Sequence, residues 1–158
     1  MAFRQWLIGL LGGRVKNDPD QAFILPPPAG VSAEEEEIDG LNFRTAIEAH
    51  QKWKGRLQAV IDSGVPDTLS VEEVSRDNLC VLGKWLHGSG NQKFGHEVLF
   101  KTLQANHAHF HVCAGKVLQS ALKGNKSEAQ TALKSGDFAH ASQAVVKDLA
   151  QLYTKIAN

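Results

Sequence analysis

One long segment of the chain limits the folds that it can adopt. Residues 92–123 contain no proline, and their apolar residues keep a helical phase until Gly124 and Asn125. Because an α-helix turns once every 3.6 residues, this spacing gathers the apolar side chains on one side. The segment therefore predicts one long helix whose apolar side must be covered by other helices. The residues in phase are Phe94, Val98, Leu99, Leu103, Phe110, Val117 and Leu118.

The same periodicity marks helices on both sides of this segment. Apolar residues recur at three- and four-residue steps over 41–63, which predicts a first helix that ends before Pro66. Ser75 is a helix-capping residue type, and it precedes a short apolar stretch that stops at Gly88 and Gly90.

The C-terminal part is divided by Ser135, Gly136 and Asp137, which predicts a helix of about ten residues from Ser127 and then a final helix. No segment has a convincing strand pattern. The sequence therefore predicts an all-α fold, an antiparallel four-helix-type bundle with an additional short helix.

The chain has 158 residues and a mass of 17.2 kDa, which suits a single domain with a tail. Residues 1–14 predict an amphipathic N-terminal segment, in which residues 1–12 can dock weakly on a membrane or a partner but are too short to span a bilayer. Residues 15–40 are rich in proline and acids and predict a flexible linker. The helical bundle is expected to occupy residues 41–158.

The charge and the cysteine content of the chain limit the kinds of partner that it can bind and the cellular compartment in which it is expected. Basic and acidic residues number 17 each, so the formal net charge is zero and no basic face for nucleic acid is indicated. The sequence carries no signal-peptide pattern, which predicts a cytoplasmic protein. The only two cysteines, Cys80 and Cys113, are then expected to be reduced thiols.

The most unusual local pattern is HAHFH at residues 107–111. Residues four apart lie on the same side of a helix, so His107 and His111 converge while His109 points nearly the opposite way. Two imidazoles at this spacing suit zinc, which needs two further ligands to complete a tetrahedron.

Two residues elsewhere in the chain can supply those ligands. His50 lies on the apolar side of the first helix, and Cys80 lies between Leu79 and Leu82 in the short helix, so both are expected to point inward. Together with His107 and His111 they predict a His3Cys zinc site in the bundle core, in which protein fills every coordination position. A hydrogen-bonded core histidine at 50 and a thiol that packs as a small hydrophobe at 80 are the alternatives.

Three blocks of the sequence resemble the chemoreceptor zinc-binding (CZB) domain family. They are AIEAHQKWKGRL (46–57), CVLGKWLHG (80–88) and HAHFHVCAG (107–115), and the likeness extends to SQAVVKDL (142–149). The resemblance implies a bacterial cytoplasmic helical module whose zinc ligands correspond to His50, Cys80, His107 and His111. It further implies a homodimer that regulates a chemoreceptor or a cyclic-di-GMP enzyme in response to zinc or to hypochlorous acid-type oxidants. No receptor or cyclase segment is expected within residues 1–158, and this is a departure from the family pattern.

The chemistry of the predicted site assigns roles to two further features. A zinc-bound thiolate is open to oxidation to sulfenic acid, so Cys80 is the predicted redox-sensitive ligand. Asp77, three residues earlier, is a candidate for adjusting the thiol or orienting a ligand histidine. The two tryptophans Trp53 and Trp85 are expected to lie in the core and shield the site from water.

Two other functions remain alternatives at this point. A zinc hydrolase would need an open coordination position and a nearby general base, but Ala108, His109 and Phe110 separate the paired histidines where HExxH enzymes place glutamate. The sequence therefore predicts a protein that is not an enzyme. An adaptor with a structural zinc ion, docking through its N-terminal segment, is the second alternative.

Overall fold

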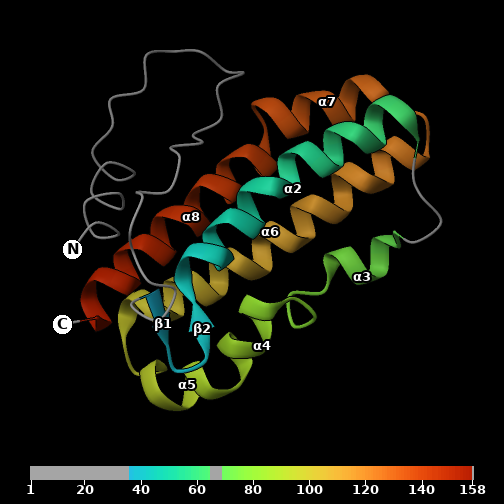
Figure 1. Ribbon diagram of the computed structural model, residues 1–158. Helices are drawn as coiled ribbons and strands as arrows, with labels where there is room; N and C mark the ends of the chain where they lie inside the picture. The colour runs from blue at the N-terminus through green and yellow to red at the C-terminus, as the bar shows by residue number, and fades with distance from the viewer. Residues whose placement is uncertain (1–35, 65–68, 158) are drawn as a thin grey trace, which may run out of the picture.

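The longest helix, α6 (Val98–Leu122), lies at the centre of the structure, a computed structural model that describes residues 36–64 and 69–157 (Figure 1). It packs most extensively against α8 (Asp137–Ile156), and both α7 (Lys126–Lys134) and α2 (Phe43–Ser63) lie alongside. The predicted all-α bundle is confirmed. The predicted N-terminal segment at 1–14 lies outside the described residues, as does most of the predicted linker at 15–40.

The bundle has four legs that alternate in direction (Figure 1). Helix α2 forms the first leg and α6 the third, while α7 and α8 together form the fourth. The second leg is broken into α3 (Val71–Ser75) and α4 (Val81–His87), and α5 (Ser89–Phe94) leads into α6. The break is important for the site because it allows Cys80, the residue directly before α4, to turn toward α6.

The helix boundaries in this second leg differ from the prediction. Ser75 is the last residue of α3, and not the N-cap that the sequence predicts. The N-cap of α3 is Ser70, whose side chain accepts a hydrogen bond from the Glu73 N–H at 3.0 Å. Helix α4 begins one residue after Cys80, and Cys80 is its N-cap. The sulfur accepts the Gly83 N–H at 3.2 Å, so a cysteine occupies a position that serine or aspartate usually fills.

The predicted long helix from residue 92 is also interrupted. Helix α5 ends at Phe94, and its C-cap is Gly95, where a Cβ atom would collide with the backbone carbonyl oxygen of Asn91. Glu97 has extended backbone angles (φ −73°, ψ 135°) and starts α6. Because the apolar periodicity continues across this turn, hydrophobic phase alone does not reveal it.

A short hairpin contradicts the prediction that the chain has no strand. Strands β1 (Glu37–Ile38) and β2 (Leu41–Asn42) pair antiparallel around Asp39 and Gly40, which both have positive φ. The Asp39 carbonyl accepts hydrogen bonds from Trp85 Nε1 and from Ser89 Oγ, each at 3.1 Å. The hairpin is thereby tied to α4 and α5, and the packed structure already includes residues that the sequence assigned to the linker.

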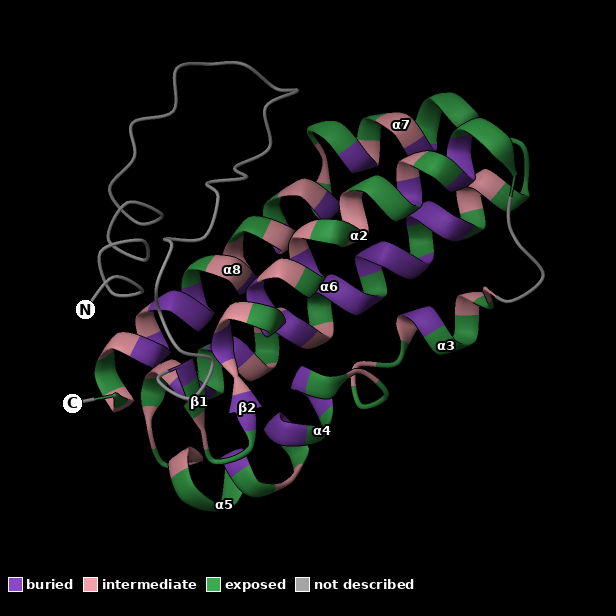
Figure 2. Ribbon diagram, viewed as in Figure 1, coloured by how far each residue is buried: buried purple, intermediate pink, exposed green. Residues whose placement is uncertain are grey.

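The apolar core follows the inward sides of the long helices (Figure 2). The largest fully buried side chains are Phe43, Phe100, Phe110 and Phe138. They hold α2, α6 and α8 together by burying aromatic surface, which stabilises a domain of this size without cross-links. Among the described residues, no helix has the length and hydropathy that crossing a membrane requires.

Candidate metal centre

Four side chains from three legs of the bundle converge in its interior. His50 comes from α2, Cys80 from the start of α4, and His107 and His111 from α6. One potential ligand atom from each lies within 4.8 Å of all the others. These are the four residues that the sequence predicted to meet, and their placement between legs explains why each points inward.

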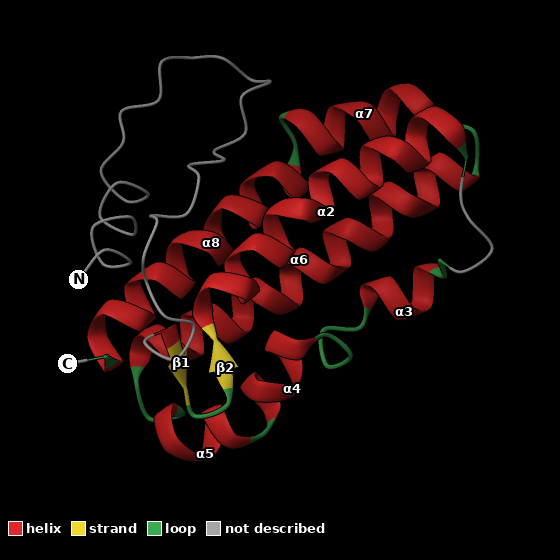
Figure 3. Ribbon diagram, in the orientation of Figure 1, coloured by secondary structure: helices red, strands yellow, loops and turns green. Residues whose placement is uncertain are grey.

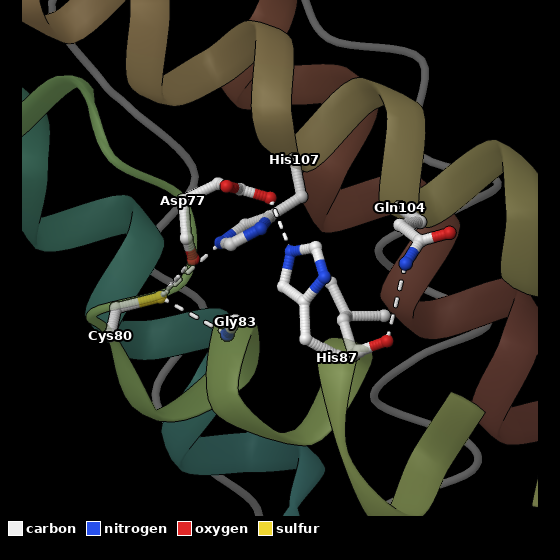
Figure 4. Close-up of polar contacts among 7 residues, drawn as sticks. Asp77, Cys80, Gly83, His87, Gln104 and His107 are labelled. Atoms are coloured by element: carbon white, nitrogen blue, oxygen red, sulfur yellow. Dashed lines mark hydrogen bonds and ion pairs between the residues drawn. The ribbon is translucent and has the colours of Figure 1, made fainter. Parts of the chain in front are cut away.

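The separations suit a small tetrahedral ion. Zinc–nitrogen bonds of about 2.0–2.1 Å and zinc–sulfur bonds of about 2.3 Å place neighbouring ligand atoms about 3.4–3.6 Å apart. The Cys80 sulfur lies 3.3 Å from His107 Nε2 (Figure 4), close to that spacing. With all four atoms inside 4.8 Å, side-chain adjustments of about an ångström close the shell.

Backbone carbonyls fix two of the imidazoles in one tautomer. His50 Nδ1 lies 2.7 Å from the Ala46 carbonyl, and His111 Nδ1 lies 2.7 Å from the Val74 carbonyl. Because a carbonyl only accepts hydrogen bonds, each Nδ1 carries the proton and each Nε2 keeps its lone pair. Both Nε2 atoms are buried without a hydrogen-bond partner among the described residues, which is costly unless a metal ion binds them.

Burial also keeps the imidazoles neutral. It lowers the pKa of His50 to about 4 and the pKa of His107 to about 2, and it lowers the pKa of His111 as well. All three rings therefore offer lone pairs at neutral pH. Burial raises the pKa of the Cys80 thiol, which the N–H groups of Gly83 and Leu82 oppose. Metal binding at this site would therefore release the thiol proton.

Phe110 contacts the rings of two of the four candidate ligands. Its ring lies 5.2 Å from the His50 ring and 5.4 Å from the His111 ring. Trp85 is buried as predicted, but it packs against Phe43, Phe94 and Phe100. Trp53 is only partly buried and carries the Arg56 guanidinium over its ring. That the two tryptophans shield the site from water stays a prediction.

Asp77 occupies a different position from the one that the sequence suggested. Residues 77–80 form a turn, so Asp77 does not share a helix side with Cys80. Its carboxylate lies 2.7 Å from His87 Nε2 (Figure 4), whereas carbonyl oxygens orient His50 and His111. Asp77 acts on Cys80 through its negative charge, which contributes to the raised pKa of the thiol.

The other histidines and the second cysteine are outside the four-residue cluster, although His87 is close enough to His107 to contribute to its lowered pKa. His87, His96, His109 and His140 are exposed. Cys113 is buried, and its sulfur lies 3.5 Å from His109 Nε2. Sequence reasoning missed the Val74 carbonyl because α3 was not predicted, whereas the Ala46 carbonyl, four residues before His50, follows from helix geometry.

The comparison with known proteins agrees with this geometry. Residues 50–118 match the family model described as the chemoreceptor zinc-binding domain. No curated protein and no solved structure matches the chain. The matched segment starts at His50 and contains Cys80, His107 and His111, which together can hold a zinc ion. Residues 50–118 are therefore similar in sequence to the chemoreceptor zinc-binding domain, and the four-residue centre lies within them.

Proposed function

We propose that this protein is a cytoplasmic sensory and regulatory module that binds one zinc ion per chain and catalyses no reaction. The convergence of His50, Cys80, His107 and His111 from three separate legs carries the proposal. Bound zinc supplies a four-coordinate cross-link and keeps the thiol deprotonated. Four protein ligands leave no open position for a reacting water, which argues against a hydrolase.

The segment around Cys80 is the part of the site whose packing depends most on the metal. His50 and His107 belong to long helices that the aromatic core holds together in any case. In contrast, the neighbours of Cys80 are exposed, Leu79 at 42% and Val81 at 72%. Loss of the metal therefore releases the start of α4 before it disturbs α2 or α6.

Oxidation of Cys80 is a second way to release the start of α4. Cys80 is half-buried, while the three histidines are almost fully buried, so the sulfur is the ligand that a small oxidant meets. A hypochlorous acid-type oxidant transfers oxygen to the Cys80 thiolate, which gives a sulfenic acid and chloride and weakens metal binding. Zinc level and oxidant thus act on one equilibrium, the attachment of α4 to the bundle.

The hairpin offers a path from α4 to the rest of the chain. The Asp39 carbonyl accepts hydrogen bonds from Trp85 in α4 and from Ser89 in α5, and Lys93 Nζ lies 3.6 Å from the Asp39 carboxylate. A shift of α4 therefore displaces the two strands, which connect to the residues before Glu36. We propose that the protein forms a homodimer. Through this path it regulates a chemoreceptor or a cyclic-di-GMP enzyme in signal transduction or chemotaxis.

A zinc-stapled adaptor is the second candidate, and the fully protein-coordinated centre favours it because such sites are commonly structural. In that case zinc only stabilises the fold, and residues 1–12, which lie outside the described residues, dock on a membrane or a partner. The two candidates differ in what zinc removal changes.

Zinc removal therefore tests the proposal by hydrogen exchange. We expect metal analysis to give about one zinc per chain, and chelation to raise exchange of the α4 amides at least about tenfold while α6 and α8 stay protected. Global loss of protection would favour the structural staple. Unchanged exchange everywhere, or a chain that binds no zinc, would contradict the sensory proposal.

A further inference from the structure

We infer that Gly83 is a positioning residue that holds the Cys80 sulfur at coordination distance, an inference that rests on the proposed zinc-binding function. Gly83 lies in the first turn of α4, is buried and has no side chain to offer the metal. The turn before α4 folds back onto it.

The turn leaves no space for a side chain at this position. A Cβ atom added to Gly83 would overlap the carbonyl oxygen of Asp77, and it would lie 2.7 Å from the Asp77 carbonyl carbon and 3.1 Å from the Asn78 Cα. All three are backbone atoms, which cannot rotate away as a flexible side chain does. A substitution at 83 must therefore move the Asp77–Asn78 backbone itself.

The same close approach holds the sulfur in place (Figure 4). The Gly83 N–H donates to Cys80 Sγ at 3.2 Å, and that sulfur lies 3.8 Å from the Asp77 carbonyl oxygen and 3.3 Å from His107 Nε2. The sulfur thus occupies the space between the first turn of α4 and the α6 histidines. Moving the turn moves the sulfur relative to His107.

The displacement is large on the scale of a metal bond. Ordinary carbon–oxygen contacts require more than 3 Å, so relieving the overlap needs a shift of about an ångström or more, whereas ligand distances tolerate only about 0.2 Å. The three histidines come from α2 and α6, which Gly83 does not position. A side chain at 83 should therefore remove the sulfur from the shell and leave the imidazoles in place.

The chain contains a matched control for this substitution. Gly55 lies within α2, is exposed, and an added Cβ there meets nothing within 4 Å. Gly83→Ala and Gly55→Ala make the same chemical change inside a helix, where alanine is intrinsically favoured over glycine. Any loss that is specific to Gly83→Ala therefore reports the steric effect.

Cobalt(II) binding to the full chain tests the inference, because a thiolate ligand to cobalt gives a sulfur-to-metal charge-transfer band that histidine ligands lack. We expect the band in the unchanged chain and in Gly55→Ala. We expect Gly83→Ala to lack it, as Cys80→Ala does, with zinc affinity lowered as much as in Cys80→Ala, by more than about 10- to 100-fold, and the helical circular dichroism retained. A full-strength band and unchanged affinity in Gly83→Ala would overturn the inference, whereas absence of the band from the unchanged chain would instead refute the proposed Cys80 ligation.

A double substitution separates positioning from general destabilisation. If Gly83 acts only through the sulfur, adding Gly83→Ala to Cys80→Ala should not weaken zinc binding further. Additive losses would contradict the inference. Should Gly83→Ala fail to fold, a glycine inserted after Asn78 loosens the turn without a clash, and we expect it to lower zinc affinity about tenfold. Unchanged affinity in that variant would also overturn the inference.

Discussion

Replacement of His107 by alanine is expected to reduce zinc content from about one ion per chain to almost none, and Cys80→Ala is expected to do the same. Each change removes one of four ligands, so the affinity should fall by more than the roughly 10- to 100-fold typical of outer-shell changes. His107 Nε2 and the Cys80 sulfur lie 3.3 Å apart, so the two variants each remove one of two neighbouring ligands of the predicted tetrahedron. Metal analysis after dialysis against a weak chelator measures the loss.

His109→Ala is the matched control for this pair. It removes an imidazole from the same helix, but His109 is exposed, and the contact that it makes is with Cys113. We expect its zinc content to equal that of the unchanged chain. Equal losses in His109→Ala, His107→Ala and Cys80→Ala would mean that the metal binds elsewhere. Circular dichroism of the metal-free variants shows whether a loss reflects unfolding, because His107 is fully buried.

Acidification is expected to destabilise the metal-free chain by several kcal/mol. Burial lowers the pKa of His50 to about 4 and of His107 to about 2 in the folded state, from about 6.5 in the unfolded chain. Below pH 6.5 the unfolded chain therefore binds protons that the folded chain excludes, so stability falls as pH falls. Each histidine contributes up to about 1.4 kcal/mol per pH unit, or about 4 kcal/mol for the pair between pH 7 and pH 5.

Urea unfolding at pH 7 and pH 5 in the presence of a chelator measures this effect. A loss of about 4 kcal/mol is a large part of the 5–15 kcal/mol that typically separates folded from unfolded domains. His140→Ala, which alters an exposed histidine, should leave the pH dependence unchanged, whereas His107→Ala should reduce it. A free energy of unfolding that is the same at both pH values would show that these imidazoles are not buried as neutral groups.

Much of the site follows from helix geometry alone. The spacing of His107 and His111 places both rings on one side of α6, and the apolar phase of α2 turns His50 inward. These residues lie in long regular helices, where periodicity is a reliable guide to direction. Cys80 was also expected to point inward, but from within a helix, whereas it is the N-cap of α4 and points inward because the turn before α4 folds back onto Gly83.

The features that sequence reasoning missed are short or depend on contacts between distant residues. Helix α3 has five residues, too few to show a helical period, so neither its Ser70 cap nor the Val74 carbonyl at His111 was anticipated. The strands have two residues each, but Asp39-Gly40 is a common hairpin turn pair and offered a signal. That Phe110 rather than Trp85 contacts the ligand rings depends on how the helices pack, which no local pattern specifies.

X-ray absorption at the zinc edge of the loaded full-length chain tests the central claim most directly. A site built from His50, Cys80, His107 and His111 predicts one sulfur at about 2.3 Å and three nitrogen ligands at about 2.0–2.1 Å, with the outer-shell scattering that imidazole rings produce. The sulfur contribution should vanish in Cys80→Ala and remain in His109→Ala. A spectrum with no sulfur, or with a five- or six-coordinate shell of oxygen ligands, would contradict the His3Cys centre.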